Sequence, residues 1–270
     1  MATLTDVGLS FMAPSLVANS LATSSIRGTR RDGTLTDMNR KPEHGLFITG
    51  TDTDVGKTYI AAAIARCLVQ QGCRVGVYKP VASGCYERDG RRVATDAEQL
   101  WQAAGSPLTV DDVCPQKFLA PLAPHVAARE EGCEVDPERL IEGIEAWADF
   151  DFVLVEGAGG LMSPLHDELY VADVAEAMGY PLVVVAANRI GVINQTLQTL
   201  IAAATFRDGL SVAGVILNDV TEQDGDKSQH TNEDELVARS VPPLLARVAH
   251  GDPSALTAID WQRLAQLELP

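Results

Sequence analysis

The chain has 270 residues, and its 37 acidic side chains outnumber its 21 Lys and Arg, so that its formal net charge is −16 at pH 7. This charge argues against a nucleic-acid partner, because binding to the phosphate backbone depends on basic residues. Hydrophobic residues make up 46% and charged residues 21%, which indicates a globular protein and excludes collagen, coiled coil and wholesale disorder.

Residues 1–43 are rich in Ser, Thr, Ala and Gly and show no sustained hydrophobic period. We interpret them as a disordered or processed N-terminal tail outside the fold. Their scarcity of acids, with Ser and Arg present, also resembles an organellar transit peptide, and Met38 offers an alternative start. The folded domain is therefore expected to comprise residues 44–270.

From Gly45 onward, short β-branched runs alternate with longer segments of helical period, which is typical of a parallel sheet with crossover helices. This pattern predicts a three-layer α/β fold with a mostly parallel sheet flanked by helices. The predicted strands are 46–49, 75–79, 152–156, 181–187, 212–217 and 244–248. The predicted helices are 59–71, 95–104, 137–148, 192–207, one after a charged loop at 221–232, and one near 259–267.

Other features of the sequence exclude several kinds of site. The five cysteines form no Cys-x-x-Cys pair and the histidines show no ligand spacing, so neither a disulfide framework nor a transition-metal site is predicted. The longest apolar runs are shorter than the roughly 20 residues that span a bilayer. We expect a cytoplasmic protein with reduced thiols and no membrane partner.

The segment GTDTDVGKT (50–58) lies between the first predicted strand and the first predicted helix. Such a loop directs backbone N–H groups and a helix N-terminus at phosphates, so it predicts a P-loop that binds ATP. Lys57 is placed to reach the outer phosphates, and the Thr58 hydroxyl can ligate Mg²⁺. Five residues rather than four separate Gly50 from Gly56, which indicates a variant subclass of P-loop NTPase-like folds.

Charged residues end two predicted strands and begin one predicted helix. Lys79 ends a strand at the carboxyl edge of the sheet, where ligands of open α/β folds bind; the alternative is an exposed strand end. Glu156 ends a buried strand, where a carboxylate is costly unless it meets a cation, although it could also be a helix cap or a surface partner. Asp96 is a candidate ligand or simply part of a helix start. Because Mg²⁺ prefers hard oxygen ligands, Thr58, Asp96 and Glu156 are the candidate metal ligands.

Two further segments follow predicted strands. The glycines of GAGG (157–160) leave backbone N–H groups free to approach a phosphate or another anion. Asn218 follows the strand at 212–217, and its amide can both donate to and accept from the edge of adenine. The alternative for Asn218 and Asp219 is a plain turn, since Asn and Asp both suit turns.

Four segments resemble, in order and approximate spacing, those of the dethiobiotin synthase family: GTDTDVGKT, KPVASG (79–84), EGAGG (156–160) and ND (218–219). The resemblance covers residues 45–248. It implies an enzyme of biotin biosynthesis that uses Mg²⁺ and ATP. The enzyme would form a carbamate from CO₂ and 7,8-diaminononanoate, phosphorylate it, and close the ring of dethiobiotin with loss of phosphate.

The resemblance also implies roles for single residues. Lys57 and Lys79 would be catalytic, because the carbamate and the γ-phosphate are both anions and two cations would neutralise charge during transfer. Ser83 would hydrogen-bond the substrate. The residues expected to bind ATP are Thr53, Asp54, Val55, Gly56, Lys57, Thr58, Asp96, Glu156, Gly157, Ala158, Gly159, Asn218 and Asp219.

The turn NRIGVIN (188–194) combines a glycine with the free N–H groups of a predicted helix start, which suits a carboxylate. In the family the corresponding turn binds the substrate carboxylate across a two-fold interface. The resemblance therefore implies a homodimer, with Gly191, Val192 and Asn194 as substrate contacts. The alternative is an ordinary strand-to-helix connection. The segment 248–250 does not resemble the aromatic-containing segment with which the family often contacts the nucleotide.

Two other classes share parts of this pattern. A partitioning or site-placement ATPase also has a deviant phosphate loop, but that class carries an extra lysine where this chain has Thr51 and Asp52. Such proteins bind DNA or membrane through a basic patch or an amphipathic helix, and the segment 264–270 is short and not basic. An ATP-dependent amidotransferase would need a glutaminase domain, for which the chain shows no candidate.

Overall fold

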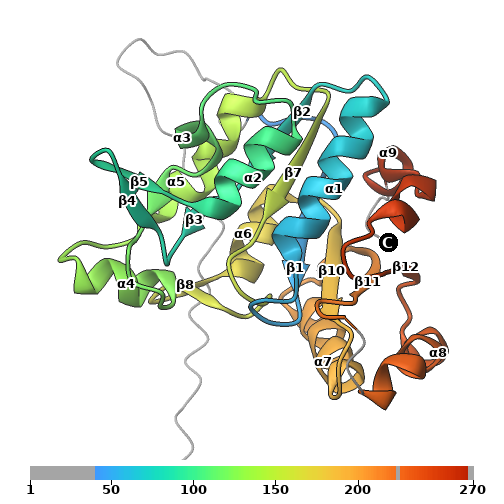
Figure 1. Ribbon diagram of the computed structural model, residues 1–270. Coiled ribbons are helices and arrows are strands. Elements are labelled where there is room, and N and C mark those ends of the chain that lie inside the picture. The colour runs from blue at the N-terminus through green and yellow to red at the C-terminus, as the bar shows by residue number, and fades with distance from the viewer. Residues whose placement is uncertain (1–39, 223–225, 267–270) are drawn as a thin grey trace, which may run out of the picture. The chain divides into compact units, whose positions relative to one another are not determined.

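The computed structural model describes residues 40–222 and 226–266. Its centre is one sheet of six parallel strands in the order β12-β11-β10-β1-β7-β2 (Figure 1). The strands of this sheet are β1 (Gly45–Gly50), β2 (Val75–Tyr78), β7 (Phe152–Glu156), β10 (Leu182–Ala187), β11 (Val212–Asn218) and β12 (Leu244–Val248). All six predicted strands are confirmed.

Helices cover both faces of the sheet, as the apolar strands require. Figure 1 shows α1 and α2 on one face and α6 and α7 on the other. Every residue of β1, β7 and β10 is buried between these layers. The helices are α1 (Lys57–Gln70), α2 (Thr95–Ala103), α3 (Val110–Val113), α4 (Pro124–Glu130), α5 (Pro137–Glu142), α6 (Val171–Met178), α7 (Val192–Thr205), α8 (Asn232–Arg239) and α9 (Trp261–Leu264). The predicted three-layer α/β fold is confirmed.

A change in crossover direction creates the place for a site. The chain leaves β1 through α1 toward β2 at one edge, whereas it leaves β7 through α6 toward β10 in the opposite direction. Since β1 and β7 are neighbours, the loops at their carboxyl ends diverge to opposite faces of the sheet. In open parallel sheets ligands bind in the crevice formed at such a point.

The predicted helix 137–148 divides into two pieces. α5 ends at Glu142, and a 3₁₀ helix follows from Gly143 to Trp147. At the junction the chain passes against Tyr78, since a Cβ placed on Gly143 would lie 2.3 Å from the Tyr78 hydroxyl oxygen. Only glycine permits this approach. Two other 3₁₀ helices, Lys227–His230 and Ser254–Ala258, lie in segments for which no helix was predicted.

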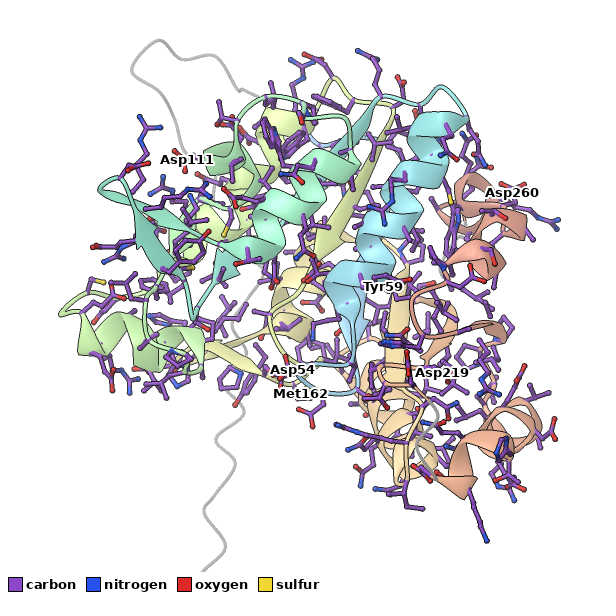
Figure 2. The ribbon with its side chains drawn as sticks, viewed as in Figure 1. Asp54, Tyr59, Asp111, Met162, Asp219 and Asp260 are labelled. Carbon is purple, nitrogen blue, oxygen red and sulfur yellow. The ribbon has the colours of Figure 1, made fainter. Side chains whose placement is uncertain are left out.

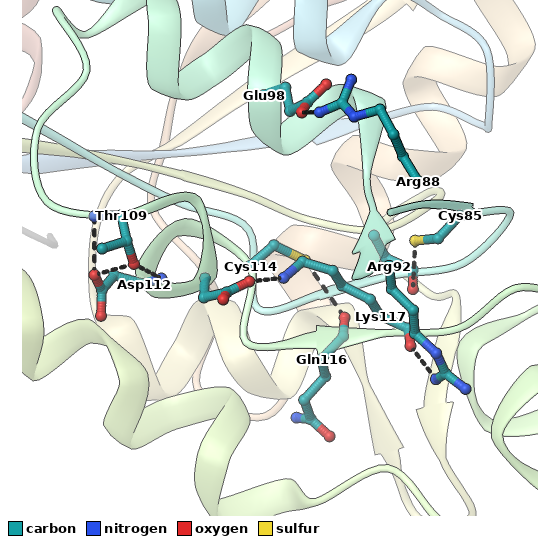
Figure 3. A network of polar contacts seen from close by, with 11 residues as sticks. Cys85, Arg88, Arg92, Glu98, Thr109, Asp112, Cys114, Gln116 and Lys117 are labelled. Carbon is teal, nitrogen blue, oxygen red and sulfur yellow. Dashed lines mark hydrogen bonds and ion pairs between the residues drawn. The ribbon is translucent and has the colours of Figure 1, made fainter. Parts of the chain in front are cut away.

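Several short elements were not predicted from the sequence. Three of them lie within the segment between β2 and α2: β3 (Val81–Ala82), β4 (Tyr86–Arg88) and β5 (Arg91–Val93). β3 pairs with β6 (Gln116–Lys117), and Arg92 donates to the carbonyl of Lys117 at 2.6 Å, which joins the β4–β5 hairpin to β6 (Figure 3). A second hairpin pairs β8 (Pro164–His166) with β9 (Leu169–Tyr170).

The last residues of the predicted tail contact the folded domain. Pro42 is buried, and its carbonyl accepts a hydrogen bond from the Tyr180 hydroxyl at 2.6 Å. The Lys41 ammonium lies 4.7 Å from the centre of the same ring. Residues 41 and 42, which the prediction assigned to the tail, therefore contact the folded domain. Most of that prediction concerns residues 1–39, which lie outside the described residues.

Within the described ranges, no helix has the length and apolar character needed to cross a membrane. All five cysteines fall in these ranges and are free thiols.

Candidate active site

The P-loop connects β1 to α1. Its backbone adopts left-handed conformations at Asp54, with φ of 54°, and at Gly56, with φ of 91°. The Lys57 side chain turns back over the loop, and its ammonium donates to the carbonyl of Asp52 at 2.9 Å. Only 7% of Lys57 is exposed. The loop therefore holds a desolvated cation beside backbone N–H groups at a helix N-terminus, the arrangement expected for phosphate.

A second cation lies between two carboxylates beside this loop. The Lys79 ammonium is 2.6 Å from Glu156 Oε1 and 3.1 Å from Asp96 Oδ2. The Thr58 hydroxyl also donates to Glu156 Oε1, at 2.8 Å. Lys79 directly follows β2, Asp96 lies in the first turn of α2, and Glu156 is the last residue of β7. Four predicted residues from separate elements are thus brought together.

Burial and charge act in opposite directions on these groups. Burial alone would lower the pKa of Lys79, but the charges of Glu156 and Asp96 outweigh it and raise that pKa above its ordinary value. Burial lowers the pKa of Lys57, and the neighbouring Lys79 charge lowers it further, although Glu156 opposes both effects. Burial would raise the pKa of Asp96, but Lys79 outweighs it and lowers that pKa. Lys79 and Asp96 therefore stay ionised at neutral pH.

These groups line a pocket of about 270 Å³ at the carboxyl ends of β1, β2 and β7. Ser83 lines this pocket, and its loop is fixed on both sides: Phe118 N donates to Ala82 O and Gly84 N donates to Ala120 O, each at 2.9 Å. The lining residues are Thr53, Asp54, Gly56, Lys57, Thr58, Lys79, Ala82, Ser83, Asp96, Glu156, Ala158 and Gly159.

Two residues predicted to bind ATP, Val55 and Gly157, have Cβ directions that face the core and not this pocket. The Val55 side chain is fully buried in the apolar core, so only its backbone is available near the loop. Gly157 faces the core, where an added Cβ would lie 2.7 Å from Val171. Periodicity does not reveal this, since the direction of each loop residue depends on the path of the backbone.

Asn218 and Asp219 lie at the same edge of the sheet, outside the pocket. Asn218 Nδ2 donates to the Val55 carbonyl at 3.0 Å, which joins the end of β11 to the P-loop. Asp219, labelled in Figure 2, is 5% exposed and is bound by Arg247 and Asn188. The Asp219 carboxylate is thus bound by protein partners, and the nucleotide contact expected at Asp219 stays a prediction.

The turn with Gly191, Val192 and Asn194 lies at the start of α7 and does not line the pocket. Gly191 adopts φ of 94° and is exposed, as is Asn194. Val192 is fully buried, so it can offer only its backbone N–H. Within one chain, the predicted carboxylate turn and the phosphate pocket are separate.

Three residues at the site were missed from the sequence. Ser163 accepts a hydrogen bond from Gly160 N at 2.9 Å and so fixes the glycine loop after β7. Asn188 and Arg247 hold Asp219. Ser163 carried a weak signal, because it follows the GAGG segment closely. Arg247 carried none, since its partner lies on another strand.

Comparison with known proteins agrees with this geometry. A family model described as an AAA domain matches residues 44–254. The ATP-dependent dethiobiotin synthetase BioD of Rhodopirellula baltica is 44% identical over 214 residues, which cover 75% of this chain and 82% of that protein. The protein of the same name from Anaeromyxobacter dehalogenans is 40% identical over 219 residues, or 81% and 90% of the two chains. A ParA family ATPase from Chlorobium tepidum aligns with a TM-score of 0.48 and 17% identity over 84% of this chain and 91% of that one, which is too distant to bear on function.

The parallel sheet, the loop after β1 and the two buried lysines define an ATP-using P-loop protein, in agreement with the matching family model. Within that class, the chain belongs to the ATP-dependent dethiobiotin synthetase family. The family predicted from the four sequence segments is confirmed, and the partitioning ATPase is not favoured.

Proposed function

We propose that the chain catalyses the ATP-dependent formation of dethiobiotin from 7,8-diaminononanoate and CO₂, with release of ADP and phosphate. The observation that carries this proposal is the pair of buried lysines in one pocket: Lys57 from the P-loop and Lys79, which is 4% exposed, from the end of β2. The identity of 40–44% to dethiobiotin synthetases supports the choice of substrate.

The reaction brings two anions together, which explains the need for two cations. A carbamate oxygen attacks the γ-phosphorus of ATP and ADP leaves. The second amine then attacks the carbamate carbon, and phosphate leaves as the ring closes. Lys57 would neutralise the phosphate that is transferred, and Lys79 would neutralise the carbamate. Because the raised pKa of Lys79 keeps it charged, its role is electrostatic rather than that of a base.

The pocket also fits Mg²⁺. Glu156 Oε2 is buried and has no hydrogen-bond partner among the described residues, so one hard oxygen is free. The Thr58 hydroxyl lies 2.8 Å from the other oxygen of Glu156, and Asp96 lines the same pocket. Two carboxylates and a hydroxyl are typical of a Mg²⁺ site completed by phosphate oxygens and water. When bound, the ion would supply positive charge to the β- and γ-phosphates. Thr58, Asp96 and Glu156 are its proposed ligands.

We also propose a homodimer in which each site is completed by the turn of the partner subunit. A groove of about 380 Å³ runs between residues 160–164 and α7. Two polar atoms at this groove, Thr51 Oγ1 and Gln195 Oε1, are buried without a hydrogen-bond partner among the described residues. Ile201 on α7 is 63% exposed, and Ile190, two residues before α7, is 80% exposed. Apolar side chains beside unsatisfied polar atoms suit a contact with a second copy. A cytoplasmic location is part of the same proposal.

The direct test is an assay of dethiobiotin formation with ATP, bicarbonate and 7,8-diaminononanoate, together with release of phosphate. We expect turnover only when all three are present, and none with the Lys79→Ala variant. Phosphate release that needs neither diamine nor bicarbonate, but increases with DNA or lipid vesicles, would contradict the proposal and favour a partitioning ATPase.

A further inference from the structure

A buried polar network joins the carboxyl ends of β10, β11 and β12. At its centre is Asp219, directly after β11. Arg247, within β12, donates to Asp219 Oδ2 through Nη2 at 2.9 Å and through Nε at 3.2 Å. Asn188, directly after β10, donates to Asp219 Oδ1 at 2.6 Å. Both oxygens of the carboxylate are therefore bound, and its charge is neutralised by one arginine.

The network extends to α8 and to the backbone. Asn232, the first residue of α8, donates to Asn188 Oδ1 at 2.9 Å. Asn188 N donates to Asn218 O at 2.8 Å, and Asp219 N donates to Val248 O at 2.9 Å. Asn188 is fully buried, and Asn232 is 3% exposed. The backbone at 218–219 is thus held from both neighbouring strands.

This network fixes the position of the Asn218 side chain. One amide hydrogen of Asn218 is used by the Val55 carbonyl, and a Cβ placed on Gly56 would lie 2.2 Å from Asn218 Nδ2. Because an amide carries two donor hydrogens and an acceptor oxygen, the second hydrogen and the oxygen can still meet a base edge. Asn218 is 3% exposed, so it cannot reorient to find a ligand.

We propose that Arg247 is a positioning residue for the nucleobase: by holding Asp219, it holds the backbone of Asn218 where the Asn218 amide contacts adenine. The inference rests on the proposed function, in which Asn218 binds the base of ATP. Arg247 itself does not line the phosphate pocket.

The physical argument is the cost of an unpaired buried charge. Without Arg247, Asp219 would keep a buried carboxylate with an amide partner alone, and the turn at 218–219 would move to hydrate it. The P-loop has anchors that do not depend on this turn: Thr51 N donates to Val185 O at 3.0 Å, and Thr58 donates to Glu156. Removal of Arg247 should therefore weaken the contact with the base and leave the binding of the phosphates unchanged.

The test compares two ligands that share the triphosphate and differ in the base. Dissociation constants for ATP and for inorganic tripolyphosphate, both with Mg²⁺, are measured by calorimetry on the full chain. We expect Arg247→Met to weaken ATP binding by about tenfold, the effect of about one lost hydrogen bond, and to change tripolyphosphate binding by less than about twofold. Arg247→Lys, which keeps the charge but not the two-pronged contact, should lie between the wild type and Arg247→Met.

The matched control is Arg239→Met, which removes an exposed arginine paired with Glu235 on α8. It should leave both dissociation constants unchanged. The double variant Arg247→Met/Asp219→Asn removes the unpaired charge, so it keeps the test valid if Arg247→Met folds poorly. Because both residues act through one contact, the double variant should bind ATP no more weakly than Arg247→Met alone.

Equal weakening of ATP and tripolyphosphate would overturn the inference, as would unchanged ATP binding in Arg247→Met. The inference would also be overturned if the double variant bound ATP more weakly than Arg247→Met alone. A wild type that binds both ligands equally well would also overturn it, because no base contact would then exist to be positioned. Formation of dethiobiotin by the wild type tests the proposed function separately, so a base-dependent loss without synthesis would support the inference while the substrate assignment fails.

Discussion

At the scale of the residue, Lys79 depends on its carboxylate partners. An isolated ammonium is costly in a buried site, and Glu156 and Asp96 offset that cost at 2.6 and 3.1 Å. The converse also holds, because Glu156 is 1% exposed and would be left without its closest cation if Lys79 were lost. The three charges therefore stabilise the fold as a group.

We predict that Lys79→Met lowers the free energy of unfolding by about 3 kcal/mol, since it leaves Glu156 buried and unpaired. The double variant Lys79→Met/Glu156→Gln should recover much of this loss, because it removes the unpaired charge. Urea unfolding at pH 7 measures both effects. A double variant that is less stable than Lys79→Met would contradict this account.

The ion pair of Lys79 and Glu156 also predicts how the stability of the fold depends on pH. Folding raises the pKa of Lys79 above its ordinary value of 10.5, so the stabilisation it gives is complete below pH 10.5 and is lost as the pH rises through the folded value. The stability difference between the wild type and Lys79→Met should therefore stay constant from neutral pH to that limit and shrink only above it. Unfolding curves of both proteins across this range test the direction of the pKa shift. A stability difference that shrinks between neutral pH and 10.5 would be inconsistent with a raised pKa of Lys79.

The two lysines are expected to differ in what remains after substitution. Lys57→Ala and Lys79→Ala should each raise the barrier to phosphoryl transfer by roughly 3–4 kcal/mol, because each removes a cation that faces growing charge. Lys57→Ala should also weaken ATP binding, whereas Lys79→Ala should retain it. Calorimetry with ATP and single-turnover phosphate release separate the two outcomes. Near-normal turnover of Lys79→Ala would remove its proposed catalytic role.

At the scale of the element, the connection between β1 and α1 requires glycine at position 56 for two reasons. Its φ of 91° is unfavourable for other residues, and its Cα lies against the Asn218 amide. Gly72, after α1, has a φ of 89°, but a Cβ added there would meet no atom of the described residues within 4 Å. At Gly72, therefore, only the backbone conformation favours glycine.

We predict that Gly72→Ala costs about 1 kcal/mol of stability through its backbone alone and leaves ATP binding intact. Gly56→Ala should cost more and weaken ATP binding severalfold, since the added methyl group displaces Asn218 or the loop. Thermal unfolding and calorimetry on the two variants provide the comparison. If the two variants lost the same stability and bound ATP equally well, the contact between Gly56 and Asn218 would affect neither stability nor ATP binding.

The elements that were predicted correctly are those whose signals are local. Each strand of the main sheet is an apolar run, and the P-loop is a continuous segment between a strand and a helix, so sequence alone placed Lys57 and Thr58 well. The strands β3 to β6 are two or three residues long, too short for a period of alternation to appear. The contact of Arg247 with Asp219 links residues 28 positions apart, and neither segment has a local pattern that predicts the contact.

At the scale of the whole molecule, the predicted substrate contacts of one chain do not all line one pocket. The phosphate pocket holds Lys79 and Ser83, whereas Asn194 lies at the start of α7, outside that pocket. A substrate with amines at one end and a carboxylate at the other could engage both groups if a second copy supplied the turn. The proposed homodimer therefore makes a prediction about which protomer supplies which residue.

Asn194→Ala should raise the Michaelis constant for 7,8-diaminononanoate and leave that for ATP unchanged, because in the proposed dimer the turn would contact only the carboxylate end of the substrate. Asn194→Asp should abolish activity, since it places a negative charge against that carboxylate. When Asn194→Asp and Lys79→Ala protomers exchange, both defects of a heterodimer fall in the same composite site and the other site is left whole. After complete exchange of equal amounts, about half of the dimers are mixed and each has one whole site of two, so activity should return to about a quarter of the wild-type value. Tagged protomers purified in two steps verify that exchange has taken place. No recovery in verified heterodimers, or a monomer at the concentration of the assay, would refute the shared site.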